Sequence, residues 1–93
     1  MLSKLPTELT KVPKDQIDKE ILRIGMIAEL DAVSFYEQLA AMTDNNQVKE
    51  VLMDIAREEK THLGEFEAML LKLDHEQVEE SEKGRKEIEE LTS

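Results

Sequence analysis

The sequence predicts an all-α protein: an antiparallel hairpin of two long helices and a short third helix, with two hairpins pairing into a four-helix bundle. Three observations support this fold class. Apolar residues recur at three- and four-residue steps along most of the chain. Aromatic residues make up only 3% of the 93 residues, with 3 Gly and 2 Pro, a balance that disfavours a twisted sheet. A cluster of turn-forming residues divides the periodic stretch in two.

The chain is predicted to begin with a flexible arm over residues 1–13, which contains both prolines and shows no sustained periodicity. Residues 14–93 are predicted to form one helical domain. Its first helix is expected from about Lys14 to Met42, on an apolar stripe of Ile17, Ile21, Ile24, Ala28, Val33, Tyr36, Leu39 and Ala40.

Short polar residues at positions 43–46 predict a turn and the cap of a second helix. That helix is expected to run to about Leu73, on a stripe of Val48, Val51, Leu52, Ile55, Ala56, Leu63, Phe66, Leu70 and Leu73. Two long helices joined by so short a turn must lie antiparallel. Asp74 and Gln77 have the spacing of a capping box, and a short, highly charged third helix is expected, interrupted near Gly84.

Composition excludes several classes of function. With 12 basic and 22 acidic residues the net charge is −10, which disfavours nucleic acid and anionic membranes as partners. The chain has no cysteine, so disulfides, thiolate zinc sites and iron–sulfur clusters are excluded. No apolar run is long enough for a membrane span, and no signal peptide is recognisable. A soluble, intracellular protein is expected, in which any metal is held by oxygen and nitrogen.

Glu59 and His62 form a Glu-x-x-His pair, and a three-residue step places both side chains on one face of a helix. In so acidic a chain this spacing alone is weak, because a solvated helix face would contain it by chance. Glu59 and Glu29, however, each interrupt an apolar stripe. A carboxylate buried without a partner is unfavourable, so this placement calls for a cation, a proton or an edge position open to water.

The level along the hairpin distinguishes these residues from two other glutamates with apolar neighbours, Glu37 and Glu67. At ~1.5 Å per residue, Glu29, Glu59 and His62 lie about 22 to 26 Å from the turn and face one another. Glu37 and Glu67 are expected at levels where they face leucines. Only the first group therefore brings two carboxylates and an imidazole together.

One Glu from one helix and Glu-x-x-His from its neighbour make half the ligand set of a di-iron or di-manganese carboxylate bundle, which uses two copies of each. Two hairpins related by a two-fold axis would complete the set and bury both apolar stripes. The sequence thus predicts a homodimer in which Glu29, Glu59 and His62 hold iron, with manganese as the other candidate. The alternative is a metal-free helical hairpin that acts as a scaffold or adaptor.

Two segments, residues 28–36 (AELDAVSFY) and 57–62 (REEKTH), are similar to those of the encapsulated ferritins, the ferritin-like cargo proteins of encapsulin shells. The resemblance covers about residues 14–73. It implies that Glu29, Glu59 and His62 are catalytic ligands of a di-iron ferroxidase centre shared between two chains, with Glu59 bridging the metals.

The resemblance also implies the setting of this activity. The dimers are expected to assemble into a ring-shaped decamer, which has no sealed cavity. Such a ring oxidises Fe²⁺ to Fe³⁺ and leaves mineral storage to an encapsulin shell. The implied location is the cytoplasm, within an encapsulin nanocompartment.

Further roles follow from the resemblance. Tyr36 matches a family tyrosine and is expected to support a metal ligand through a hydrogen bond, with ordinary core packing as the alternative. Asp31 keeps one acidic position of the family's iron-uptake site, or else is solvated. Ala28 replaces a glutamate of that site, which is expected to weaken it, and Phe35 stands where some relatives have tryptophan. Surface roles are expected for Glu58, Glu65 and His75.

A peroxide-reducing di-iron protein of the rubrerythrin kind is a second alternative. It is disfavoured because the chain has no cysteine and no second Glu-x-x-His. The final residues, Glu89–Ser93, lack the apolar, basic tail that often directs cargo into encapsulins. Attachment to a shell, by fusion or by targeting, is therefore left open, as is the choice between O₂ and peroxide as oxidant.

Overall fold

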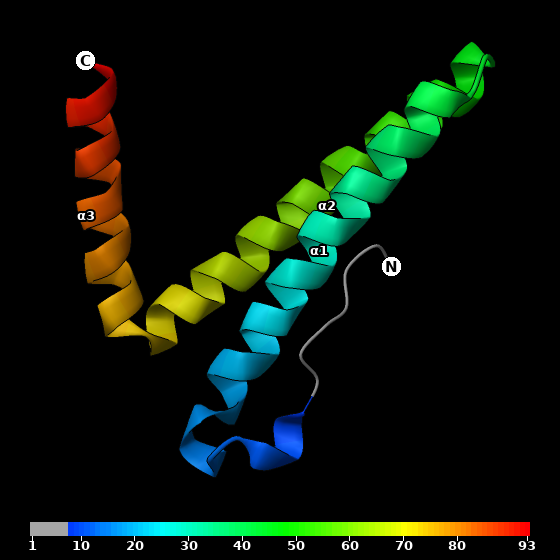
Figure 1. The fold of residues 1–93 in the computed structure, drawn as a ribbon. Coiled ribbons are helices and arrows are strands. Elements are labelled where there is room, and N and C mark those ends of the chain that lie inside the picture. The colour runs from blue at the N-terminus through cyan, green and yellow to red at the C-terminus, as the bar shows by residue number, and fades with distance from the viewer. Residues whose placement is uncertain (1–7) are drawn as a thin grey trace.

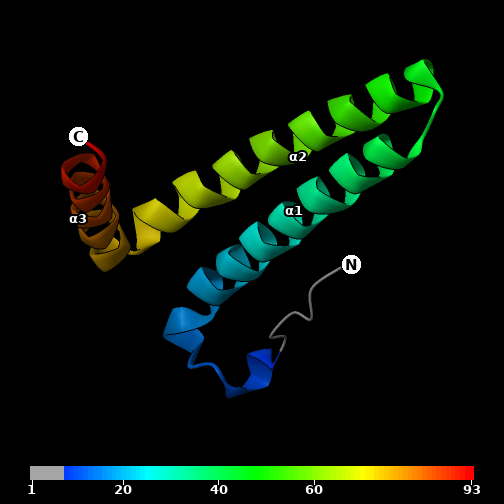
Figure 2. The same ribbon diagram turned by 45° about the horizontal axis from the view of Figure 1, so that its top comes forward.

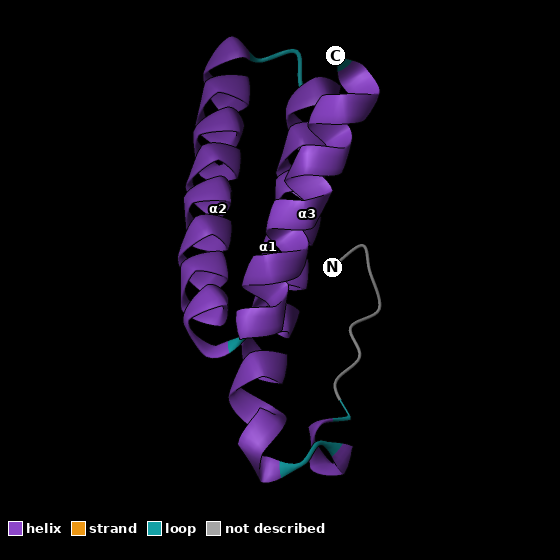
Figure 3. Ribbon diagram, turned by 90° about the vertical axis from the view of Figure 1, so that its left-hand side faces the viewer, coloured by secondary structure: helices purple, strands orange, loops and turns teal. Residues whose placement is uncertain are grey.

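The computed structural model describes residues 8–93 and confirms the all-α fold class. α1 and α2 run antiparallel as a long hairpin, and α3 turns away at the far end of α2 (Figures 1 and 2). Within the described residues, only helices and their connections are present (Figure 3). None of these helices is long and apolar enough to cross a membrane. In chain order, the elements are two 3₁₀ turns, Leu9–Lys11 and Lys14–Gln16, and three helices, α1 (Ile17–Met42), α2 (Asn46–Leu73) and α3 (His75–Thr92).

The start of the chain is only partly covered by the structure. Of the predicted flexible arm, residues 1–7 lie outside the described residues, and flexibility over residues 1–13 stays a prediction. α1 begins three residues after the predicted start at Lys14. The reason is local: the Gln16 N–H donates to the Pro13 carbonyl at 2.9 Å, which closes a tighter 3₁₀ turn before the regular helix.

The hairpin turn follows the prediction closely. Asn45 is the N-cap of α2, and its side-chain oxygen accepts the backbone N–H groups of Gln47 at 2.9 Å and Val48 at 3.0 Å. The hydroxyl of Thr43 accepts the Asn45 N–H at 3.1 Å. These bonds satisfy amides that have no partner inside the helix and turn the chain back on itself.

Contact between α1 and α2 buries few side chains completely. Among residues 8–93, the buried apolar residues are Ala40, Ala56 and Leu70, and two of the three are small enough to let the helices approach closely. Many large apolar side chains stay exposed on the isolated chain, among them Ile21, Leu30, Phe35, Val48, Val51 and Met69. A single hairpin therefore buries only part of its apolar surface.

Asp74 joins α2 to α3 and ties the junction to α1. Its backbone N–H donates to Leu70 O at 2.9 Å, and its carboxylate accepts the Gln77 N–H at 3.0 Å as the N-cap of α3. The same carboxylate accepts a charged hydrogen bond from Arg23 Nη2 of α1 at 2.9 Å. The predicted cap is confirmed in its first half, whereas the Gln77 side chain donates to Ser81 Oγ instead of reaching back.

The predicted interruption of the third helix near Gly84 is wrong, because α3 runs unbroken through this glycine. A glycine in a helix interior costs about 1 kcal/mol relative to alanine, which weakens a helix without ending it. Charged pairs one turn apart bracket the position: Glu80 with Lys83, and Arg85 with Glu82 and Glu89. These pairs support the helical spacing on both sides of the glycine.

Candidate metal centre

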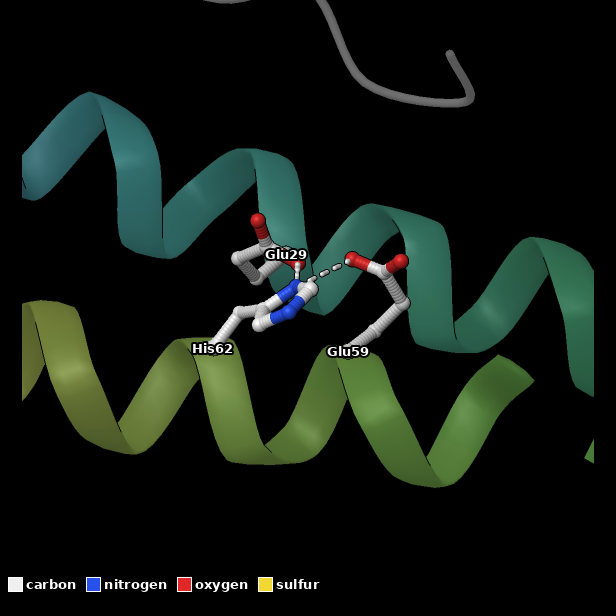
Figure 4. Close-up of side chains that lie close together, drawn as sticks. All are labelled: Glu29, Glu59 and His62. Atoms are coloured by element: carbon white, nitrogen blue, oxygen red, sulfur yellow. Dashed lines mark ion pairs between the residues drawn. The ribbon is translucent and has the colours of Figure 1, made fainter. Parts of the chain in front are cut away.

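Glu29, Glu59 and His62 converge across the hairpin at mid-length. Glu29 projects from α1, and the other two project from successive turns of α2 toward it (Figure 4). His62 Nδ1 lies 3.6 Å from Glu29 Oε2 and 3.5 Å from Glu59 Oε2. One ligand atom from each residue lies within 4.8 Å of the others. The predicted convergence is present, whereas the role of the three residues as metal ligands stays a prediction.

The two carboxylates are largely buried, whereas the imidazole of His62 is exposed to solvent. The side chain of Glu29 is 17% exposed and that of Glu59 21%, whereas His62 is 47% exposed. Glu29 Oε2 is inaccessible to solvent and accepts no hydrogen bond. A buried carboxylate oxygen without a donor is destabilising in the free protein, so it calls for a further partner. A metal cation bound between these three side chains would supply one.

The charges of the three groups act on one another. Burial raises the pKa of Glu29 above its ordinary value, and the adjacent Glu59 carboxylate raises it further. Loss of solvation lowers the pKa of His62, but the carboxylates of Glu59, Glu29 and Glu65 together outweigh this effect. The His62 pKa therefore lies above its ordinary value. Both pKa values therefore lie above their ordinary values, so protons compete with a cation for these side chains up to a higher pH than for isolated groups.

A hollow of about 390 Å³ adjoins the centre. Glu29 and His62 open into it, together with an additional carboxylate, Glu65. Apolar side chains form the rest of its lining: Leu22, Phe66 and Met69. Glu65 is exposed, in agreement with the predicted surface role, and it also lines this hollow. Its three-residue spacing from His62 is the signal in the sequence that places it on this side of α2.

The other glutamates with apolar neighbours take no part in this group. Glu37 was expected to face a leucine, but its carboxylate lies 3.5 Å from Lys60 Nζ. The level of Glu37 opposite a leucine stays a prediction, and the ion pair shows that its carboxylate is neutralised by a lysine rather than by a shared metal. Glu67 is exposed and lines a different hollow, with Arg23 and Leu70.

The sequence pattern of the rubrerythrin family matches residues 20–92. The chain belongs to the rubrerythrin family. The resemblance to encapsulated ferritins is confirmed as well. The crystal structure of an encapsulated ferritin domain from Pyrococcus furiosus superposes with a TM-score of 0.84 at 48% identity, covering 99% of this chain and 96% of that one.

Two curated relatives of this rubrerythrin-family chain extend the comparison. A ferritin-like–encapsulin shell fusion protein of Pyrococcus furiosus is 48% identical over 95 positions, covering 99% of this chain. The encapsulin nanocompartment cargo protein EncC of Myxococcus xanthus is 34% identical over 70 positions, covering 72% of this chain. The chain spans 27% of the length of the first protein and 54% of the second.

The residues singled out by the encapsulated-ferritin resemblance lie around α1. Tyr36 packs edge-on against Phe35, with ring centroids 5.4 Å apart, and in the described part of the chain it makes no hydrogen bond to the centre. Its supporting role stays a prediction. Asp31 is buried, so the alternative of a solvated side chain is wrong. It lies two residues from Glu29, about 200° around the helix, and lines another hollow with Ile27 and Ser34. Its role in iron uptake stays a prediction.

Proposed function

We propose that this chain is a ferroxidase, which oxidises Fe²⁺ to Fe³⁺ at a di-iron centre completed by a second copy of the chain. The observation that carries the proposal is the convergence of Glu29 with Glu59 and His62, together with the inaccessible Oε2 of Glu29, which accepts no hydrogen bond. A bundle-type dinuclear site needs two such sets. One chain has one set, so a two-fold dimer supplies four carboxylates and two imidazoles.

The donor set fits iron. Carboxylate oxygens with one imidazole per metal suit Fe²⁺ and also Mn²⁺, and the chain has no thiolate that would favour softer ions. Bound iron would supply one-electron redox chemistry: two Fe²⁺ release two electrons, which with two protons reduce O₂ to hydrogen peroxide or hydrogen peroxide to two waters. Glu29 and Glu59 would offset the positive charge of the ions, and Glu59 is the residue we assign to bridge them.

The exposed apolar surface supports the dimer. Val48, Val51 and Met69 recur with His62 at helical spacing on one face of α2, and all four side chains are exposed on the isolated chain. Met69 and His62 border the same hollow, so this face of α2 includes the exposed side of the centre. A partner hairpin laid on it would bury apolar area and complete the ligand set together. We propose further, as the resemblance to encapsulated ferritins implies, that these dimers form a ring-shaped decamer.

We propose that the oxidised iron is delivered within an encapsulin shell in the cytoplasm. Both curated relatives are named for encapsulins, one as a fusion to the shell protein and one as cargo. Fusion or targeting would each place this chain on the inner side of a shell. Mineral storage would then be the task of the compartment.

Native mass spectrometry during anaerobic Fe²⁺ addition tests the centre and the assembly together. We expect even-numbered oligomers, ideally decamers, that saturate near one iron per chain, followed by fast oxidation when oxygen is admitted. Glu59→Ala should abolish the fast phase, and Glu58→Ala, one residue away and exposed, should not. A metal-indifferent monomer or dimer would favour the scaffold alternative, and native-rate oxidation by Glu59→Ala would show that the site is misassigned.

Membership of the rubrerythrin family favours peroxide reduction as a second candidate activity. The two activities differ in the oxidant that reacts first with the reduced protein. Stopped-flow oxidation of the Fe²⁺-loaded protein by O₂ and by hydrogen peroxide at equal concentrations separates them. A rate with peroxide that exceeds the rate with O₂ by tenfold or more would favour the second activity.

A further inference from the structure

α3 is joined to the hairpin through a single residue. Asp74 is the only residue between α2 and α3, and its backbone dihedrals are φ −126° and ψ 88°. α3 buries none of its side chains, and its large apolar residues Val78, Ile88 and Leu91 are exposed. Packing therefore does little to fix the direction in which α3 leaves the hairpin (Figure 2), and a connection of one residue allows many directions.

The two carboxylate oxygens of Asp74 have separate partners. Oδ1 accepts the backbone N–H of Gln77 at 3.0 Å, which fixes the first turn of α3. Oδ2 accepts a hydrogen bond from Arg23 Nη2 at 2.9 Å, which holds the same carboxylate against α1. The Asp74 side chain is only 9% exposed, and a hydrogen bond between two charged groups is stronger than one between neutral groups. One carboxylate thus connects the start of α3 directly to α1.

The other polar side-chain contacts of α3 lie within the helix itself. Ion pairs such as that of Arg85 with Glu82 follow helical spacing and reach no other element. Within residues 8–93, no further side-chain hydrogen bond or ion pair joins α3 or Asp74 to α1 or α2. The direction of α3 relative to α1 therefore depends on the contact between Arg23 and Asp74.

We propose that the ion pair of Arg23 with Asp74 is a latch that fixes the direction of α3 relative to the hairpin. The latch defines a hollow of about 570 Å³ that residues of all three helices line, among them Arg23 itself, Leu71 and Ser81. Without the latch, Asp74 acts as a hinge, α3 takes a range of directions, and the hollow loses its defined shape. The latch includes no metal ligand and is independent of the proposed function.

Arg57 provides a matched control for Arg23. It also pairs with an aspartate, since Arg57 Nη1 lies 3.0 Å from Asp54 Oδ1. These two residues lie three positions apart on α2, so their ion pair joins no separate elements. Arg57→Met and Arg23→Met each remove one guanidinium charge and leave an unbranched side chain. A difference between the variants therefore reports on the connection between helices rather than on net charge.

Double electron–electron resonance between two nitroxide spin labels measures the direction of α3. The chain has no cysteine, so labels can be attached through Glu50→Cys on α2 and Lys86→Cys on α3, both at exposed positions. A second labelled pair, Glu50→Cys with Asp18→Cys on α1, reports on the hairpin alone. The labelled full chain is mixed with a large excess of unlabelled chain of the same variant before assembly, so that only distances within one chain are read.

We expect Arg23→Met to widen the distribution of distances between positions 50 and 86 by about twofold or more. The distribution between positions 50 and 18 and the helical circular dichroism should match the wild type, because α3 stays folded and capped by Asp74. Asp74→Asn, which keeps the capping oxygen, should widen the same distribution, and Arg57→Met should not.

A wild-type distribution in Arg23→Met would overturn the latch, even if Asp74→Asn widened it, because the widening would then come from a weaker cap. Equal widening in Arg57→Met would overturn it as well, since that arginine joins no separate elements. Widening between positions 50 and 18 would show that the hairpin moves instead of α3, and a loss of helical signal would show that α3 unfolds instead of turning. Either of these results would also overturn the proposal.

Discussion

The ring of Phe66 lies directly against Gly25, where α2 crosses α1 beside the candidate centre. A β-carbon built on Gly25 would lie 2.9 Å from Phe66 Cε1 and 3.0 Å from two further ring carbons. Any side chain at position 25 would therefore displace the ring. Because Phe66 is part of the wall of the hollow and Gly25 precedes Glu29 by one helical turn, this contact helps to shape the site.

Gly25→Ala should impair metal binding by pushing the Phe66 ring toward the hollow. Alanine should raise the stability of the helix by up to about 1 kcal/mol relative to glycine, but the clash with Phe66 should offset this gain in stability. Gly64 has no neighbour within 4 Å of an added β-carbon, so Gly64→Ala should show the gain alone. Thermal unfolding and Co²⁺ titration of both variants measure the two effects. A Gly25→Ala protein as stable as Gly64→Ala, with wild-type metal affinity, would contradict the account.

Glu29→Gln should separate stability from metal binding. Removing the charge of a sheltered carboxylate whose Oε2 has no donor should raise the stability of the metal-free protein by about 1 kcal/mol. The same change should abolish the rise in melting temperature that a bound cation gives the wild type. Differential scanning calorimetry with chelator and with added Co²⁺ checks both. A metal-dependent rise that persists in this variant would remove Glu29 from the ligand set.

Val51→Glu should disrupt the dimer without touching a proposed ligand. Val51 is 59% exposed on the isolated chain and lies on the same face of α2 as His62, where a charge in a dimer interface would be buried unpaired. Met53→Glu is the control, because position 53 is about 200° around the helix from position 51. Native mass spectrometry should show smaller oligomers and fewer bound iron ions for Val51→Glu, whereas Met53→Glu should match the wild type in both. Intact assembly in that variant would place the interface elsewhere.

Asp74 should make the junction between α2 and α3 sensitive to acid. The backbone N–H of Gln77 lowers the pKa of Asp74; burial opposes this, and the charges of Lys19 and Arg23 lower the pKa further. A carboxyl group whose pKa falls on folding stabilises the protein above its unfolded pKa, about 4, and this contribution is lost as the pH falls through the folded value.

Asp74→Asn therefore should lower the melting temperature at pH 7, and the deficit should shrink below about pH 4. Asparagine keeps the capping oxygen, so Asp74→Ala should melt lower still at both pH values. Circular dichroism melts from pH 7 to pH 2 measure the series. A deficit for Asp74→Asn that is constant over this range would show that the ion pair with Arg23 contributes nothing.

Local pattern was sufficient for most of the secondary structure. Asn45 caps α2 and Asp74 caps α3 because their short side chains place an oxygen where it accepts a backbone N–H group at the start of the helix. Gly84 is the exception: the low helix propensity of one glycine predicts a break, but the charged pairs on both sides support an unbroken α3.

The residue pattern alone is sufficient to predict the hairpin and the meeting of Glu29 with Glu59 and His62. Helical rise and a short turn constrain which levels face each other, and a three-residue step constrains which side chains share a face.

Other contacts could be found only from the folded hairpin, because their geometry depends on how the two helices are rotated and offset relative to each other. Arg23 reaches Asp74, 51 positions away, and Phe66 rests on Gly25. Glu65 opens into the hollow beside His62 for the same reason. Rotation, offset and side-chain reach are properties of the packed pair, because each is set by the fit of one helix surface into the other.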